Sequence, residues 1–289
     1  MTALYERELM SGTMHGTVIL YHADCHDGFG AAYAAWKKFG QNASYIAVYH
    51  GDDPPKGLEG REVFIADFSY PIDTLLKLEQ GAKRLVILDH HSGAEEAVRA
   101  VQEHVFDLKR SGAGIAWGYF HPEKPLPKLL EYVQDNDLWR FALPHVKEIG
   151  AFLSSTVKEF STWDALAKDF EGESKLFEFT TRGKRMLDEH AQAVAKFAKK
   201  AVLVTLDGHK VLAIQAPRKY RSELGHVLSD KHPPFAIVWY EHHGMQYFSI
   251  RRNGSIDVAE IAKRHGGNGH HDASSFQLPL SAPLPFKKG

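Results

Sequence analysis

The sequence predicts an α/β protein with a doubly wound, mainly parallel sheet in its first domain, a helical linker, and a smaller α/β domain at its C-terminal end. Apolar segments typical of buried strands alternate with helical segments over residues 17–120. Such alternation is typical of a parallel sheet with helices on both faces. After a long charged segment the pattern changes to short strands separated by turn residues. We therefore expect two domains joined by a helix.

The first domain repeats a unit of strand, polar turn and helix. Its predicted strands are the apolar runs 17–21, 44–49, 63–66 and 85–88. Helices are predicted over residues 29–36, from Pro71 onward, over 94–101, over 114–120 with Ser111 as N-cap, and over 129–134. Residues 1–16 show no clear periodicity and are expected to form a loose arm.

The second half of the chain has a different pattern. A long amphipathic helix rich in charge is predicted over residues 175–200. It is followed by predicted strands at 202–205, 211–214, 235–240 and 245–251, and by helices at 222–228 and 257–264. We therefore place the first domain at residues 1–185, the helical linker at 186–200 and the second domain at 201–289.

The charge and cysteine content limit the partners and the compartment. Lys and Arg number 35 against 36 Asp and Glu, so the net charge is -1. A chain without excess positive charge lacks the general attraction that holds long nucleic acids, and no long duplex DNA is expected as a partner. The single cysteine, Cys25, excludes an internal disulfide framework. With no long apolar run and no basic-then-apolar leader, we expect a cytoplasmic protein without membrane contact.

Acidic and histidine side chains follow three of the predicted strands. Ligands collect beyond the carboxyl ends of parallel strands, so these side chains should meet at one edge of the sheet. Carboxylates with imidazole suit Mn²⁺ or Mg²⁺, and a carboxylate shared by two ions allows water between them to attack phosphorus. Asp67, alone at its strand end, is the natural bridge. The candidates are His22, Asp24, Asp27, Asp67, Asp89, His90 and His91.

Each cluster also has a simpler interpretation. Asp and His at strand ends cap helices or lie in solvent, and the recurrence at three successive turns is what favours a metal site. Asp135 and Asp137, which follow a predicted helix, are by themselves typical of a solvated loop. Cys25 and His26 lie between candidate ligands and are interpreted as neighbours of the ligands.

These residues resemble the motifs of the DHH phosphoesterases. Asp89-His90-His91 is the signature tripeptide of that family. Residues 18–32, 65–67 and 133–141 are similar to three further motifs, and residues 266–274 are similar to the glycine-rich motif of the DHH-associated domain. A tripeptide alone recurs by chance, whereas five motifs in the family's order span nearly the whole chain.

The resemblance implies a two-metal phosphoesterase, commonly dependent on Mn²⁺ with Mg²⁺ or Co²⁺ as alternatives, whose first domain is catalytic and whose second binds substrate. One metal would be bound by His22 and Asp24, Asp67 would bridge, and the other metal would be bound by Asp27, His90 and one of Asp135 or Asp137. His91 would contact the scissile phosphate or help to protonate the leaving oxygen, and Asp89 would orient the histidines.

Two positions depart from the family pattern. Many members space the first-motif aspartates two apart, whereas Asp24 and Asp27 are three apart with Cys25-His26 inserted. Asn268 interrupts an otherwise common glycine run. The second departure bears on how closely the backbone approaches a phosphate or base.

The glycine-rich segment also has a physical interpretation of its own. Glycines let the backbone approach a ligand and present N–H groups to an anion, while arginines at a strand end bind phosphate through two nitrogens. The simpler alternative is a helix stop followed by a turn with exposed histidines. The candidate substrate-binding residues are Arg251, Arg252, Gly266, Gly267, Gly269 and His270.

These features predict a phosphodiesterase, similar to 3′–5′ exonucleases, that cleaves very short RNA or linear or cyclic dinucleotides. The near-neutral charge favours small substrates over long strands. The alternative is a phosphoanhydride hydrolase that acts on pyrophosphate, polyphosphate or nucleoside polyphosphates with the same metals. A regulatory nucleotide-binding module without catalysis is a third hypothesis, and the filled clusters argue against it. A homodimer is compatible with the sequence, which does not specify the oligomeric state.

Overall fold

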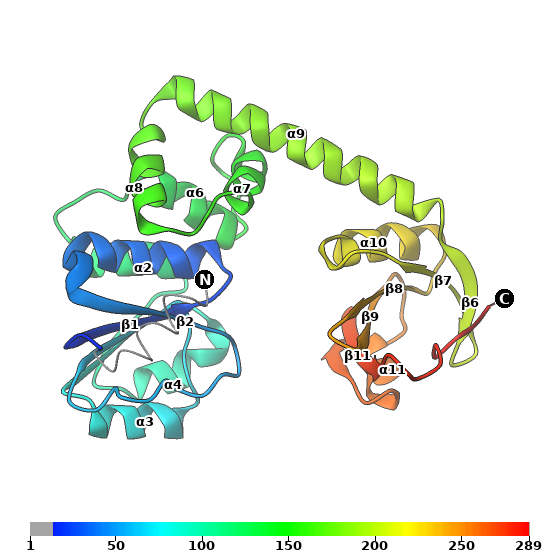
Figure 1. Cartoon of the computed structure of the whole chain (residues 1–289), viewed down its shortest axis with the longest axis horizontal. Coiled ribbons are helices and arrows are strands. Elements are labelled where there is room, and N and C mark those ends of the chain that lie inside the picture. The colour runs from blue at the N-terminus through cyan, green and yellow to red at the C-terminus, as the bar shows by residue number, and fades with distance from the viewer. Residues whose placement is uncertain (1–13, 289) are drawn as a thin grey trace. The chain divides into compact units, whose positions relative to one another are not determined.

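The structure, a computed structural model, describes residues 14–288 (Figure 1). The chain divides into two compact units, of which the first ends at Met186 and the second begins at Leu187. Each unit has its own sheet and its own hydrophobic core. Most of the arm predicted over residues 1–16 lies outside the described residues.

The first unit is built on an all-parallel, five-stranded sheet, which confirms the predicted fold class. Its spatial order is β2-β1-β3-β4-β5. The strand β5 was not predicted, because it opens on polar Glu103-His104 and its residues are only partly buried, so no apolar run marks it. The strands are β1 (Thr17–His22), β2 (Ala43–Val48), β3 (Glu62–Ala66), β4 (Arg84–Asp89) and β5 (Glu103–Phe106).

Helices cover both faces of this sheet (Figure 1). The helices α2 and α5 pack on the face that contains Ile19 and Val86, and α3 and α4 pack on the opposite face, which contains Leu20 and Ile87. Successive strand residues therefore enter two different cores, which is why these strands are apolar without alternation. The four helices are α2 (His26–Phe39), α3 (Ile72–Gly81), α4 (Glu95–Arg99) and α5 (Gly112–Phe120), and 3₁₀ turns occupy Gly40–Asn42 and Ser92–Ala94.

Three more helices, α6 (Lys128–Asp137), α7 (Val146–Ser154) and α8 (Phe160–Asp169), extend the core on the α2 side. The helices α7 and α8 were not predicted. Both are short, and helices of this length depend on tertiary packing for stability. In α8 that packing comes from the fully buried Trp163, whose ring contacts Phe29 at a centroid distance of 4.9 Å.

The long helix α9 (Glu173–Ala198) runs across the boundary between the units. Its 26 residues include most of the segment predicted as a linker, and the predicted helix 175–200 agrees with it to within two residues at each end. It is also the longest described helix, and its polar residues recur along its length. No helix within residues 14–288 contains an apolar stretch long enough to cross a membrane.

The second unit contains a mixed, seven-stranded sheet in the order β10-β11-β9-β8-β7-β6-β12. Its strand pairs are antiparallel except β7 with β8, which are joined by the crossover helix α10. One face packs on α10 and the other on α11. The elements are β6 (Val202–Leu206), β7 (His209–Gln215), a 3₁₀ turn (Arg218–Tyr220), α10 (Arg221–Lys231), β8 (Phe235–His242), β9 (Met245–Arg252), α11 (Val258–Arg264), β10 (Asn268–His270), β11 (Ala273–Pro279) and β12 (Lys287–Lys288).

Asp164 connects α8 to α2 through its carboxylate. That group accepts a hydrogen bond from Lys37 Nζ at 2.6 Å and from the Tyr33 hydroxyl at 3.1 Å, and it pairs with Lys168 Nζ at 2.9 Å. The hydrogen bonds from Lys37 and Lys168 lower the pKa of Asp164 to about 2. Asp164 therefore stabilises the folded chain as an anion.

Replacing this carboxylate by Asp164→Asn should lower the free energy of unfolding at pH 7 by about 1 kcal/mol, the upper value for pairs of this kind. The folded-state pKa lies below the unfolded value of about 3.9. The contribution is therefore complete above that value and disappears as the pH falls through about 2. Urea unfolding of both proteins between pH 7 and pH 2 checks this, and a difference that does not change with pH would contradict it.

Candidate metal centre

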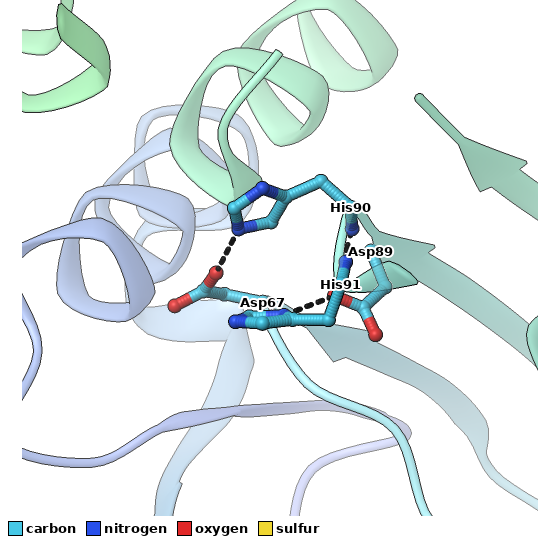
Figure 2. A group of neighbouring side chains, drawn as sticks. All are labelled: Asp67, Asp89, His90 and His91. Atoms are coloured by element: carbon cyan, nitrogen blue, oxygen red, sulfur yellow. Dashed lines mark hydrogen bonds and ion pairs between the residues drawn. The ribbon is translucent and has the colours of Figure 1, made fainter. Parts of the chain in front are cut away.

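The carboxyl ends of β1, β3 and β4 meet where the strand order reverses. From β1 the chain passes to β2 on one side and then to β3 on the other, and ligands in parallel sheets bind at such a reversal. His22 ends β1, Asp67 follows β3, and Asp89-His90-His91 ends and follows β4. Figure 2 shows Asp67 beside the triplet. The fold thus gathers these five side chains at one edge.

Asp67 is buried at the centre of this group. Its backbone has a φ of +65°, and its N–H donates to the Leu88 carbonyl at 2.9 Å, which fixes the turn after β3. Its Oδ1 lies 3.2 Å from Nε2 of His90 (Figure 2). Its Oδ2 lies 3.5 Å from Nδ1 of His22. Burial raises the pKa of Asp67, but hydrogen bonds with His22 and His90 outweigh it and hold the pKa at about 2. Asp67 is therefore an anion that reaches two imidazoles.

His90 faces three carboxylates with one ring nitrogen. Its Nε2 lies 3.2 Å from Asp67 Oδ1, 3.5 Å from Asp137 Oδ2 and 3.6 Å from Asp27 Oδ2. The His90 side chain is 10% exposed, and Asp27 and Asp67 are each 1% exposed. Negative charges at such distances inside a protein repel one another unless a proton or a cation lies between them.

Asp27 is held by the N-terminus of α5. Its Oδ2 accepts a hydrogen bond from the backbone N–H of Gly112 at 2.5 Å, and its Oδ1 accepts one from Ala113 at 3.0 Å. These are the free N–H groups of a helix start, where the helix dipole also favours negative charge. Burial, followed by the charges of Asp67 and Asp137, nevertheless raises the pKa of Asp27 well above its usual range. Gly112 was not among the predicted site residues, and the small residues after Ser111 are the sequence signal that could have identified it.

His91 is held by Asp89, and the two form a donor group with Asp67 and His90 in which all ligand atoms lie within 4.8 Å of one another. The His91 Nδ1 lies 2.8 Å from Asp89 Oδ1, which also accepts the backbone N–H of His90 at 2.7 Å (Figure 2). Asp89 is fully buried, whereas the His91 side chain is 50% exposed. The hydrogen bond with Asp89 raises the pKa of His91. The pair therefore offers the Nε2 edge of the His91 imidazole to a ligand.

The structure separates the roles of Asp135 and Asp137. Asp135 is buried, and its two oxygens accept the backbone N–H groups of Ala142 at 3.2 Å and Leu143 at 3.0 Å. Asp137, two residues further on at the end of α6, has an oxygen 3.5 Å from His90 Nε2. Asp135 thus fixes the loop after α6, and Asp137 reaches the cluster.

Asp24 and Cys25 differ in whether they reach the metal-donor cluster: Cys25 does and Asp24 does not. Asp24 is exposed, has a φ of +53° and forms a side-chain hydrogen bond with Tyr49, whose pKa its charge raises. Cys25, the N-cap residue of α2, is half-buried, and its sulfur lies close enough to His22 and Asp67 for the three to hold one ion. Burial and the charge of Asp67 raise the pKa of Cys25 to about 11. Among the described residues, Asp24 joins no group of metal donors.

In the second unit, two of the candidate substrate-binding residues share one row of the sheet. Arg251 of β9 lies opposite Ala273 of β11, which lies opposite His270 of β10. Side chains in such a row point to the same face. Arg252, the next residue, instead forms an ion pair with Asp272. The structure therefore places Arg251 and His270 on the same face of the second sheet, whereas Arg252 is paired with Asp272.

Arg221, the first residue of α10, lies near Arg251. It was not among the predicted substrate-binding residues. Burial lowers the pKa of Arg251, and the positive charge of Arg221 lowers it further. The stem of Arg251 packs on α10, where a Cβ at Gly225 would lie 2.7 Å from its Cγ. Two neighbouring guanidinium groups such as Arg221 and Arg251 attract an anion. The basic run Arg218-Lys219-Tyr220-Arg221 was the signal that could have identified it.

The backbone of the second unit requires glycine in the segment 266–269. Gly266, with a φ of +76°, follows α11, and its N–H donates to Lys263 at 3.0 Å while that of Gly267 donates to Ala262 at 2.8 Å. This is the usual two-bond helix stop. A Cβ at Gly269 would lie 2.4 Å from Ser274 Cα, so the close pairing of β10 with β11 requires glycine there. The helix-stop interpretation is thus present in the structure, and anion binding by these glycines stays a prediction.

Comparison with known proteins gives two sequence relatives and a shared fold. No family model matches the chain. It is 30% identical over 298 residues to an uncharacterized protein of Acanthamoeba polyphaga mimivirus, covering 94% of this chain and 70% of that protein. It is 24% identical to the oligoribonuclease NrnB of Bacillus subtilis, covering 90% of this chain and 73% of NrnB. The solved DHH domain of a member of the S1p family of ribosomal proteins matches 94% of this chain and 84% of its own, with a TM-score of 0.54 at 14% identity.

The chain belongs to the DHH phosphoesterase superfamily. Members of this superfamily are hydrolases, and this DHH protein is accordingly an enzyme. The predicted resemblance to the DHH phosphoesterases is confirmed. The fold matches that of the solved DHH domain over nearly the whole chain, and Asp89-His90-His91 lies at the sheet edge where parallel sheets bind ligands.

The donor set of this DHH enzyme fits divalent cations. His22, Cys25 and Asp67 form one group in which all donor atoms lie within 4.8 Å of one another, and Asp27, His90 and Asp137 form another. A cation beside His90 would compensate the three carboxylates around that imidazole, which otherwise repel. Burial is the main reason that the pKa of Asp27 is raised, and the nearby charges of Asp67 and Asp137 raise it further.

Gly112→Ala tests whether the start of α5 is shaped around Asp67. A Cβ at this position would lie 2.5 Å from Asp67 Cβ and 2.6 Å from its Oδ1, so the carboxylate must shift. We expect a loss of stability of about 1–3 kcal/mol, as for other overpacked sites, and weaker Mn²⁺ binding in calorimetric titration. Gly16→Ala is the matched control, because nothing lies within 4 Å of its Cβ. Equal Mn²⁺ affinity in both variants would contradict the arrangement.

Asp89→Asn tests the orienting hydrogen bond of the triplet. The Asp89 carboxylate raises the pKa of His91, so its replacement by a neutral amide should lower that pKa. The pKa is measured by NMR titration of the imidazole in metal-free protein. Asp24→Asn serves as the control, since Asp24 is not among the groups that shift His91. An unchanged His91 titration in Asp89→Asn would show that the pair does not form.

Proposed function

We propose that this enzyme is a metal-dependent phosphodiesterase that hydrolyses short nucleotides, such as very short RNA or linear or cyclic dinucleotides. The observation that supports it most directly is the pair of donor groups around Asp67 with the half-exposed His91 beside them. The sequence relative NrnB is named an oligoribonuclease. A cytoplasmic location agrees with the single cysteine of the chain.

In this proposal two divalent cations, Mn²⁺ in the first instance, occupy the two donor groups. The two carboxylate oxygens of Asp67 face different histidines of the centre, Oδ2 facing His22 and Oδ1 facing His90. Asp67 would therefore serve both metal positions. Bound cations supply Lewis acidity and lower the pKa of water, which favours attack on phosphorus near neutral pH. Asp27 and Asp137 complete the His90 side. The amides of α5 keep Asp27 in place.

His91 is assigned the contact with the phosphate. Its Nδ1 is taken by Asp89, so its Nε2 is the nitrogen left to donate to a phosphate oxygen or to the departing oxygen. The raised pKa of His91 keeps the ring charged to higher pH, which suits either task. Asp89 acts through His91 and is a positioning residue.

The second unit is assigned the binding of substrate phosphate. Arg251 and His270 share one face of its sheet, and Arg221 adds positive charge beside Arg251. This local charge suits a short anion, while the net charge of -1 gives no general attraction to long nucleic acids. The glycine-rich segment at 266–269 completes this predicted set.

The direct test is an assay of the full-length protein with Mn²⁺ on a linear dinucleotide, a cyclic dinucleotide, a short RNA, long single-stranded DNA, pyrophosphate and polyphosphate. We expect turnover of the dinucleotides or the short RNA and little turnover of long DNA. Turnover restricted to pyrophosphate or polyphosphate would replace the proposal by a phosphoanhydride hydrolase. Binding of nucleotide without any turnover would support a regulatory module.

Substitutions separate the two assigned roles. Asp67→Asn and His90→Ala should each lower kcat by more than about 100-fold, the upper value for residues that merely support metal ligands. His270→Ala should raise KM while the metal content, measured by atomic emission, stays at the wild-type value. Circular dichroism of each variant controls for folding. Full activity in Asp67→Asn, or loss of metal in His270→Ala, would contradict the assignment.

A further inference from the structure

The two donor groups of the metal centre differ in chemistry. The group around His90 contains His90 with Asp27 and Asp137, so its ligand atoms are one nitrogen and carboxylate oxygens. The group around His22 contains a nitrogen, a carboxylate and the sulfur of Cys25. Sulfur is a much softer ligand than oxygen, so the two sides should not prefer the same cation.

The backbone explains why Cys25 lies there. Strand β1 ends at His22, helix α2 begins at His26, and a tight turn joins them. Asp24 takes a left-handed conformation in this turn, with a φ of +53°, and Cys25 returns to an extended one, with φ -106° and ψ 147°. A left-handed residue reverses the local direction of the chain, and here the carboxylate of Asp24 lies outward beside Tyr49.

The position of α2 fixes this turn. A Cβ at Gly28 would lie 2.2 Å from the His22 carbonyl oxygen, so the first turn of α2 is packed directly on the end of β1. That contact leaves little freedom to rotate the turn and bring Asp24 inward. Cys25 rather than Asp24 is therefore the residue held beside His22 and Asp67.

We propose that Cys25 is the protein ligand that completes the His22 and Asp67 side of the centre, and that this side selects a softer cation such as Zn²⁺ while the His90 side retains Mn²⁺ or Mg²⁺. The inference rests on the two-metal part of the proposed function and goes beyond it by making the centre a mixed one. It also replaces Asp24 by Cys25 in the ligand set that the family resemblance implied.

The binding step is a simple exchange. The Cys25 S–H bond breaks, the electron pair stays on sulfur and is donated to the cation, and the proton passes to solvent. No oxidant or reductant takes part. Thiolate and imidazole suit Zn²⁺, whereas sites made mainly of carboxylate suit Mn²⁺ and Mg²⁺.

Cobalt spectroscopy tests the proposal without reference to activity. The metal-free whole chain is titrated with Co²⁺ in the presence of a reductant that contains no thiol, and sulfur-to-cobalt charge-transfer absorption is recorded in the near ultraviolet. Because Cys25 is the single cysteine of the chain, any such band identifies its sulfur as the ligand. We expect the band to saturate at one Co²⁺ per chain and a second Co²⁺ to bind without adding to it.

Three variants sharpen this experiment. Cys25→Ser should abolish the band and weaken Zn²⁺ binding by more than about tenfold, the smaller effect known for residues that only support a ligand. Cys25→Asp should abolish the band, keep two ions per chain and shift the metal preference of that side toward Mn²⁺. Asp24→Asn is the matched control of the same turn and should keep both the band and two bound ions.

Two results would overturn the proposal. One is a protein that binds two Co²⁺ without the charge-transfer band, and the other is loss of one ion in Asp24→Asn but not in Cys25→Ser. These failures differ from failure of the proposed function, which is judged by nucleotide turnover. A charge-transfer band without nucleotide turnover would support Cys25 as a metal ligand and contradict the phosphodiesterase activity. Nucleotide turnover without the band would support the activity and contradict Cys25 as a ligand.

Discussion

The crowding of buried carboxylates around one imidazole is the constraint on which the first unit depends. Asp27, Asp67 and Asp137 all approach Nε2 of His90, and the first two are almost completely buried. Such charges cannot remain together without compensation. The chain supplies part of it through the amides of α5 and the imidazole of His22, and the rest is of the kind that a bound cation provides. The site is therefore costly to form without ligands and well suited to metals.

The rigid elements around the site hold these groups at fixed distances. Asp67 is fixed by its left-handed turn after β3, Asp27 by the start of α5, and Asp137 by the end of α6. Asp135 secures the loop that follows α6. Helices and parallel strand ends position side chains more accurately than free loops do, which suits chemistry at phosphorus. The same packing leaves no room for a Cβ at Gly112, so the backbone itself is shaped around Asp67.

The proposed activity divides the work between chemically different groups. The carboxylate-rich side around His90 suits a hard cation, and the sulfur-containing side around His22 suits a softer one. The Asp89–His91 pair lies beside both, in a donor group with Asp67 and His90. In the second unit, Arg251 lies close enough to Arg221 for their positive charges to interact, and this is the charge that the proposal assigns to binding an anionic substrate.

The sequence by itself determined the alternation of strands and helices, the parallel first sheet, and the arrival of His22, Asp67 and Asp89-His90-His91 at strand ends, because periodicity and strand termini are local properties. It missed the strands β5, β10, β11 and β12 and the helices α7 and α8, whose residues become ordered only through packing. The tertiary structure decided which neighbours enter the site. It places Asp137 at the cluster and Asp135 in a loop, and Cys25 beside His22 while Asp24 faces Tyr49. The physical reason is that a left-handed residue, or a shift of two residues along a helix, reverses the direction of a side chain, and only the packing of α2 and α6 fixes that direction.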